Sequence, residues 1–327
     1  MRHSILHLVW IALLGITLGG CQDDDDIAEP TPSLFEEQQQ TIEQFLQDQG
    51  ITTQQTAAGL YYQAITENED GTSPEAGNII HLYYRIEQLD GALIAELDSS
   101  QNDPITFTFQ YPGPNRFHVT LPTGLDEMVG TMREGEEYEF FLPSGAAYLD
   151  YEIPNVLPAN AIVRARILVD KVLTVAEQRL VEDQKIKDYI AAESLTGFDS
   201  LASGVYYATN QAGDTSVQVT TSSTVGLRYT GLLLDGTVFD NNTEAGRELL
   251  EVAAGGQGAI EGFLTGIQQM SLGEKGTIII PSHAAYGPGV VAIPQTIVKD
   301  LLEEGARFST IPPFAILRFD VEAVTIN

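Results

Sequence analysis

The residues of this sequence that could support chemistry are aromatic and apolar rather than nucleophilic. After residue 21 the 327-residue chain keeps three histidines, His81, His118 and His283, which lie far apart in the sequence. They lack the spacing of metal ligands or of a Ser-His-Asp triad. The glycine-rich segment 255–258 lacks the spacing of a dinucleotide-binding turn. We therefore expect no metal, no cofactor and no covalent nucleophile.

Three segments in the second half of the chain place aromatic residues close to a few polar ones. They read YTGLLLDGTVFDN (229–241), GAIEGFLTGIQQMSLGEKGTIIIPSHAAYG (258–287) and IPPFAILRFDVEAV (311–324). From residue 225 onward this part resembles the FKBP-type peptidyl-prolyl cis-trans isomerases. The resemblance rests on the Tyr-Thr-Gly strand, the Asp-Gly hairpin followed by Phe-Asp, the helix with an early aromatic, the Ala-Tyr-Gly loop and the final strand.

This resemblance implies a peptide-binding pocket. Phe263 would be its floor under the proline ring, and Asp240 would approach the substrate amide. The Tyr286 hydroxyl and the Ile311 backbone N–H would donate hydrogen bonds to substrate carbonyls. Each aromatic residue alone is more typical of a hydrophobic core, but the whole set indicates a pocket. The apolar and aromatic residues expected to line the pocket are Tyr229, Phe239, Leu250, Ala259, Ile260, Phe263, Ile311 and Phe319.

An apolar pocket of this kind can accelerate rotation about an X-Pro peptide bond. Resonance sets a barrier of about 18–20 kcal/mol, and the two X-Pro isomers exchange over tens to hundreds of seconds. The twisted transition state has lost resonance and is less polar than the planar amide. Apolar surroundings and well-placed donors therefore favour the transition state over the ground state.

Phe239 and Asp240 are neighbours on a predicted strand. Adjacent strand residues point to opposite faces of a sheet, so both can reach one pocket only if the strand bends or ends there. We therefore expect a bulge or a strand end at these two residues, with the Tyr229 hydroxyl holding the Asp240 carboxylate.

The second half departs from the family pattern at three places. Leu250 stands where an aromatic residue is usual, and Phe263 replaces a common tryptophan; both changes keep the site apolar. An insertion at 288–309 (PGVVAIPQTIVKDLLEEGARFS) follows the Ala-Tyr-Gly loop. It is either a surface elaboration or a lid that selects partners. It leaves the substrate range and macrolide binding open.

The elements that must position these residues occur twice in the chain. The segment GLYY at 59–62 matches GVYY at 204–207, LPSGAAY at 142–148 matches IPSHAAY at 280–286, and 157–169 matches 311–323, in the same order. We conclude that two homologous domains are present, unit one (33–173) and unit two (174–327). The repeat is far too long for a solenoid.

Each unit begins with a helix and continues as strands. Ser33 with Glu36, and Thr174 with Glu177, have the spacing of capping boxes. Apolar runs around the Asp-Gly pair at 235–236 predict a hairpin, and the spacing of 263, 267 and 270 predicts a short helix. We therefore predict an α+β fold in which each unit is a curved antiparallel sheet wrapped on a short helix, preceded by an N-terminal helix.

Unit one has lost most of the proposed site. Phe239 corresponds to Ile94, Asp240 to Ala95, Phe263 to Leu125 and Phe319 to Ala165, whereas Tyr84, Tyr148 and the Leu157-Pro158 pair remain. Loss of the carboxylate and most aromatics indicates a non-catalytic FKBP-like domain. It could still bind extended peptides.

The first residues have the features of a targeting signal. Arg2 precedes an apolar run at 8–18, which is too short to span a membrane and fits a secretory signal peptide over 1–20. Leu-Gly-Gly before Cys21 resembles the lipobox of bacterial lipoproteins, which implies acylation of Cys21, with palmitate among the possible chains. The alternative is a buried free cysteine. As this is the only cysteine, disulfides within the chain are excluded.

The acidic stretch 21–32 follows directly as a flexible tether. Its aspartates are either a solvated charge run or a surface-export signal. The formal net charge of −30 makes nucleic-acid binding improbable. We expect lipid anchoring in the cell envelope, at the outer membrane on its periplasmic or surface face.

Three functions from different classes fit these features. The first is a prolyl isomerase acting mainly through unit two on proline-containing unfolded or exported polypeptides. The second is a chaperone whose two units clasp unfolded chains. The third is a non-enzymatic lipoprotein that uses FKBP folds as interaction surfaces. Asp240, Phe239 and Tyr286 favour the first function.

Overall fold

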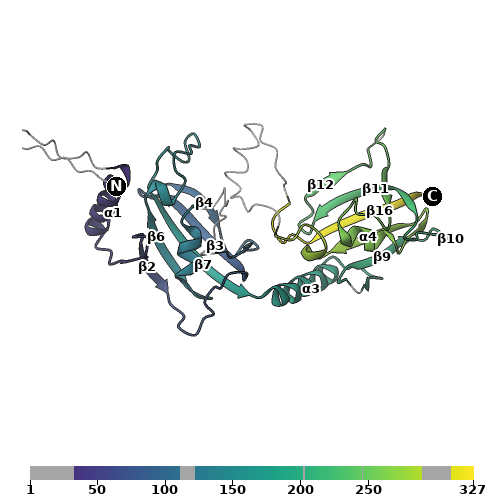
Figure 1. Cartoon of the computed structure of the whole chain (residues 1–327), viewed down its shortest axis with the longest axis horizontal. Coiled ribbons are helices and arrows are strands. Elements are labelled where there is room, and N and C mark those ends of the chain that lie inside the picture. Colours follow the sequence, from purple (N-terminus) through teal and green to yellow (C-terminus); the bar gives the residue numbers. More distant parts are fainter. Residues whose placement is uncertain (1–32, 111–121, 202, 245, 289–310) are drawn as a thin grey trace, which may run out of the picture.

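The computed structural model describes residues 33–110, 122–201, 203–244, 246–288 and 311–327. These residues form two seven-stranded antiparallel sheets, one in each unit (Figure 1). The first has the order β1-β2-β6-β7-β3-β4, with β5 also paired to β3. The second has the order β8-β9-β15-β16-β11-β12, with β13 also paired to β11. The two sheets therefore share one topology, and the α+β fold class predicted from the sequence is confirmed.

The strands of unit one are β1 (Gln54–Gln55), β2 (Tyr61–Thr66), β3 (Ile79–Gln88), β4 (Leu93–Leu97), β5 (Ile105–Thr108), β6 (Glu137–Leu142) and β7 (Val163–Leu173). Those of the sheet in unit two are β8 (Asp199–Ser200), β9 (Tyr206–Gln211), β11 (Thr224–Leu233), β12 (Val238–Asn241), β13 (Leu250–Ala253), β15 (Lys275–Ile280) and β16 (Leu317–Ile326). A separate two-stranded sheet pairs β10 (Asp214–Gln218) with β14 (Ser271–Leu272).

Each unit begins with a long helix, α1 (Leu34–Gln49) or α3 (Val175–Ala192). Both predicted capping boxes are present: the side chains of Ser33 and Thr174 accept from the backbone N–H three residues later, and the glutamates there bond back. Gly50 ends α1 in the left-handed conformation at φ 65°. Figure 1 shows α3 running from the end of β7 to the second sheet.

One short helix packs against each sheet, on the face that carries the main apolar core of the unit. This face is called the inner face. These are α2 (Leu125–Gly130) and α4 (Glu261–Ile267), and single 3-10 turns follow at η1 (Ser144–Ala146) and η2 (Ser282–Ala284). Phe263 and Ile267 of α4 belong to the main apolar core of unit two. The long helix α3 covers the other face, where Ile186 packs with Ile279. Because β15 is buried on both faces, its sequence KGTIII is continuously apolar at its end.

The predicted hairpin at Asp235-Gly236 is confirmed. The Gly236 backbone has φ 87°, and Leu233 N–H donates to the carbonyl of Thr237 across the turn. Glycine tolerates this conformation without the steric penalty of a side chain.

Several predicted features lie outside the described residues. They are the leader 1–20, the tether 21–32 with Cys21, His118, and residues 289–309 of the insertion. Among the residues that are described, no helix combines the length and the apolar character needed to cross a membrane.

Candidate active site

Four aromatic rings of unit two contact one another on the inner face of its sheet. The Phe263 and Phe319 ring centroids are 4.9 Å apart, and Phe239 meets Phe319 edge-on at 5.6 Å. Tyr229 lies 6.3 Å from Phe263 and 6.2 Å from Phe319. Phe263 and Phe319 are buried, whereas Tyr229 and Phe239 are partly exposed. The cluster therefore has a buried base and an accessible edge.

A β-bulge places Phe239 in this cluster. Along the β11–β12 pair, Gly231 opposes Asp240 and Leu232 opposes Val238, so Phe239 is the extra residue. A bulge breaks the strict alternation of side chains. The bend expected from the sequence is thus present, and Phe239 and Asp240 both meet the cluster.

Gly231 gives the Phe239 ring its space. A Cβ atom at Gly231 would lie 2.6 Å from Cζ of Phe239 and 3.0 Å from Cε1 of Phe319. Such distances are shorter than van der Waals contact, so any side chain at this position would displace a ring. Sequence reasoning saw the Tyr-Thr-Gly motif but not this role of its glycine.

The Tyr229 hydroxyl donates a hydrogen bond of 2.5 Å to Oδ2 of Asp240, as expected from the sequence. Partial burial raises the pKa of Tyr229, and the Asp240 carboxylate and the Tyr286 hydroxyl raise it further. Tyr229 therefore stays protonated and donates to the carboxylate throughout the physiological range. Asp240 is fixed at the exposed edge of the ring cluster.

Two residues missed by sequence reasoning hold the chain directly after Asp240. The buried Asn242 side chain accepts from the Tyr229 N–H at 2.8 Å and donates to the carbonyls of Leu227 and Glu248. Arg228 donates from Nη1 to the carbonyls of Asn242, Arg247 and Glu248. The polar Asn-Asn pair at the end of β12 was the available signal for Asn242.

Of the other predicted site residues, three lie in or against the core that holds the cluster, and two are exposed. Ile311 is buried in the core that contains Phe263, and Ala259 and Ile260 pack against that core at the start of α4. Leu250 is exposed on β13, opposite Leu227. Tyr286 is 48% exposed, and it interacts electrostatically with Tyr229.

The corresponding region of unit one is filled by its own side chains. Ile86 stands where unit two has Gly231, and the bulged residue of β4 is the buried Ile94. The Leu157 N–H, the counterpart of the Ile311 donor, is bonded to the Ile153 carbonyl at 2.9 Å. The Tyr148 hydroxyl is buried, without a hydrogen-bond partner among the described residues. In unit one, therefore, this backbone N–H is bonded internally and this hydroxyl is enclosed.

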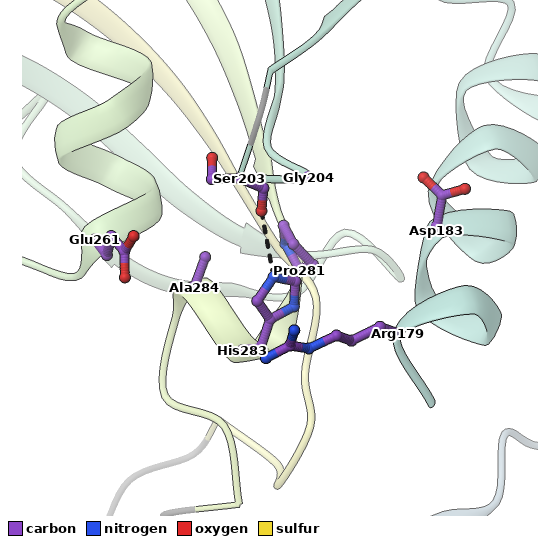
Figure 2. A pocket seen from close by; sticks show the side chains of 8 residues that line it. All are labelled: Arg179, Asp183, Ser203, Gly204, Glu261, Pro281, His283 and Ala284. Carbon is purple, nitrogen blue, oxygen red and sulfur yellow. Dashed lines mark hydrogen bonds between the residues drawn. The ribbon is translucent and has the colours of Figure 1, made fainter. Parts of the chain in front are cut away.

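A separate cavity of about 470 Å³ lies between α3 and the η2 turn (Figure 2). His283 bonds there to the Ser203 carbonyl at 3.2 Å, and Arg179 extends toward it from α3. None of the predicted site residues lines this cavity, which is formed by Arg179, Asp183, Ser203, Gly204, Glu261, Pro281, His283 and Ala284.

Comparison with known proteins agrees with this geometry. A family described as FKBP-type peptidyl-prolyl cis-trans isomerase matches residues 215–324. FK506-binding protein 1 of Rhizopus delemar is 33% identical over 124 residues, which cover 38% of this chain and 99% of that protein. The FKBP-type peptidyl-prolyl cis-trans isomerase FkpA of Aeromonas hydrophila is 33% identical over 154 residues, 46% of this chain and 50% of the relative.

Outer membrane protein MIP of Legionella longbeachae is 36% identical over 105 residues, 32% of this chain and 43% of the relative. The chain spans about half the length of the first curated relatives that it matches. The Rhizopus protein, in contrast, is covered almost completely. With its matching segment, bulged Phe-Asp strand and ring cluster, the chain belongs to the FKBP-type peptidyl-prolyl cis-trans isomerase family.

Proposed function

We propose that this protein is a peptidyl-prolyl cis-trans isomerase whose activity resides in unit two. Its substrates are proline-containing segments of unfolded or exported polypeptides. The observation that carries the proposal is the bulge at Phe239, which joins an apolar ring cluster to a carboxylate held by Tyr229. The family match over 215–324, within unit two, supports it.

Each group has a role in rotation about the X-Pro bond. The buried Phe263 and Phe319 rings receive the proline ring, and Phe239 and Tyr229 form the sides. Apolar contact favours the twisted, less polar amide over the planar one. Asp240 faces the substrate amide, while the Tyr286 hydroxyl and the Ile311 N–H hold the flanking carbonyls. A rate gain of about 10⁵ would require about 7 kcal/mol from these contacts together.

Unit one is proposed to be a non-catalytic domain of the same fold. Ile86 and Ile94, which stand in place of Gly231 and Phe239, and Ile153 are all buried in the core of unit one. The Leu157 N–H is bonded to the Ile153 carbonyl within the unit. These contacts support a structural or peptide-holding role.

The cell envelope is the proposed location. The relatives include a protein named for the outer membrane, and Cys21 follows a leader-like apolar run. We propose that acylation of Cys21 anchors the protein, with residues 21–32 as its tether. Two or more acyl chains would give stable anchoring, since each buried methylene contributes about 0.8 kcal/mol.

The deciding experiment is an isomerisation assay of the full chain on an X-Pro peptide by exchange NMR. The expected result is acceleration that disappears in Phe239→Ala, which opens the ring cluster. A folded protein without acceleration would exclude the isomerase. If that protein still suppressed aggregation of an unfolded client, the chaperone alternative would replace it.

A further inference from the structure

Helix α3 has three more residues at its N-terminal end than α1 has at the equivalent end. Glu182 of α3 and Gln38 of α1 occupy equivalent places, since each accepts from the backbone N–H and hydroxyl of the matching serine, Ser282 or Ser144. Gln38 is the fifth residue of α1, whereas Glu182 is the eighth residue of α3. The early part of α3 therefore has no counterpart in α1.

The extra residues 175–177 precede Gln178, which contacts unit one and corresponds to Leu34, the first residue of α1. Its Oε1 lies 2.8 Å from Nε2 of His81, a residue of β3. His81 alternates with Ile80 and Leu82, which belong to the inner core, so its side chain points to the outer face. His81 and Gln178 are each only 6% exposed. Lys185 and Asp103 form a second, exposed contact at 2.9 Å.

The buried bonds form one continuous chain with a defined direction. The Gln178 amide donates from Nε2 to Oε1 of Glu182 at 3.0 Å. The Ser282 N–H donates to Oε2 of Glu182 at 2.8 Å, and the Ser282 hydroxyl to Oε1 at 2.6 Å. With its amide nitrogen committed to Glu182, Gln178 must accept from His81. His81 is therefore the tautomer with the proton on Nε2.

This series of hydrogen bonds ends at the loop that carries Tyr286. The Ser282 carbonyl accepts from the N–H groups of Ala285 and Gly287, the two residues that flank Tyr286. Glu182 and Ser282 are each 2% exposed, so water competes little for these bonds. Unit one repeats the final step, with the Ser144 carbonyl accepting from Ala147 and Leu149 around Tyr148.

We propose that unit one positions the Tyr286 loop of unit two through the buried chain from His81 to Ser282. Gln178 and Glu182 are positioning residues in this arrangement, because they act on the substrate only through Tyr286. The degenerate unit is thereby a support for the site of the other unit. This inference rests on the proposed isomerase function, but its structural part can be tested without it.

The first test is Gln178→Leu in the full chain, with Gln184→Leu as the matched control. Gln184 lies exposed on the same helix, and its side chain bonds to Asp188 among the residues that the structure describes. The expected result is faster amide hydrogen exchange at Ala285 and Gly287, with unchanged exchange at Ala147 and Leu149. The KM for an X-Pro peptide should rise about two- to tenfold, the equivalent of one net hydrogen bond, while kcat changes less.

The second test is Glu182→Gln, which conserves shape but adds a donor. The new amide nitrogen cannot face the Ser282 N–H, because both groups are donors. It must therefore lie toward the Gln178 amide and the Ser282 hydroxyl, which can both turn from donors into acceptors. A reversed Gln178 then donates to His81, whose proton must move to Nδ1. Imidazole nitrogen NMR should report this change of tautomer, which a merely local role of Glu182 would not produce.

Unchanged exchange at Ala285 and Gly287 in Gln178→Leu, or an unchanged His81 tautomer in Glu182→Gln, would overturn the proposal. If the parent chain lacked isomerase activity, the proposed function would fail while both measurements still decided the structural claim. Faster exchange with an unchanged KM would overturn the link to Tyr286.

Discussion

The Tyr229 hydroxyl and the Asp240 carboxylate share a 2.5 Å hydrogen bond although they stand on two different strands. The bond is possible because Phe239 is bulged out between Val238 and Asp240. The bulge gives the ring to the apolar cluster and leaves the carboxylate at its exposed edge. One local irregularity of the backbone thus creates the polar and apolar parts of the site together.

Replacing Asp240 tests the chemical part of this relationship. Asp240→Asn keeps the shape but removes the charge, so we expect kcat/KM for an X-Pro peptide to fall at least about tenfold, or about 1.4 kcal/mol. The pKa of Tyr229 should decrease, because the carboxylate that helps to raise it is gone. Peptide exchange and spectroscopic titration would measure both effects.

The matched control is Asp235→Asn, which changes an exposed carboxylate in the neighbouring hairpin. Its activity should equal that of the parent chain. Equal activity of Asp240→Asn and Asp235→Asn would remove Asp240 from the mechanism.

The space at Gly231 gives a second prediction. Gly231→Ala would place a methyl group 2.6 Å from the Phe239 ring, so that ring must move. Overpacking of this kind costs about 1–3 kcal/mol, and urea unfolding should show it together with reduced activity. Gly258→Ala, where an added Cβ meets nothing within 4 Å, should leave the stability nearly unchanged. Similar stability losses in both variants would contradict the close packing at Gly231.

The sequence predicts most of this site because its signals are local. The capping boxes span four residues, the hairpin depends on one Asp-Gly pair, and the bulge follows from two neighbours that must share a face. The chain from His81 to Ser282 is different. Its partners are 97 and 100 residues apart, so no local pattern joins them.

A weak signal for that chain exists on α3. Residues 178, 182 and 186 follow one another at intervals of four and are all buried on one face. Two of the three, Gln178 and Glu182, are polar, which is unusual for the buried face of a helix. Polar residues on a buried stripe must find partners, but only the folded structure identifies His81 as a partner of Gln178 and Ser282 as a partner of Glu182.

Separating the two units tests the division of labour. Each unit has its own sheet and its own apolar core, so we expect both fragments to fold. Residues 174–327 should accelerate X-Pro exchange, less than the full chain does, because His81 is missing. Residues 33–173 should be inactive, because Ile94 and Ala95 replace the Phe-Asp pair. Comparable activity of both fragments would show that the losses in unit one do not matter.

Substitution of Cys21 tests the anchor. Cys21→Ser removes the sulfur that would be acylated, so the protein should leave the membrane fraction or keep its leader. Fractionation followed by mass measurement distinguishes these outcomes from the parent protein. A variant that remains membrane-bound with its leader removed would exclude lipidation at this residue.

The buried Glu274 predicts an acid-sensitive stability of unit two. Burial by itself would raise the pKa of Glu274, but bonds from the Tyr207 and Thr209 hydroxyls and the Ser271 N–H lower it below 4.5. Since the folded pKa is the lower one, the stabilisation is complete above pH 4.5 and is lost as the pH falls through the folded value. Glu274→Gln should lower the free energy of unfolding at pH 7 by about 1–3 kcal/mol.

This difference from the parent chain should shrink toward pH 3. The control Glu251→Gln, at an exposed position on β13, should change the free energy of unfolding little at either pH. Urea unfolding at both pH values measures these differences, and a Glu274→Gln deficit that grew on acidification would contradict the assigned direction of the pKa.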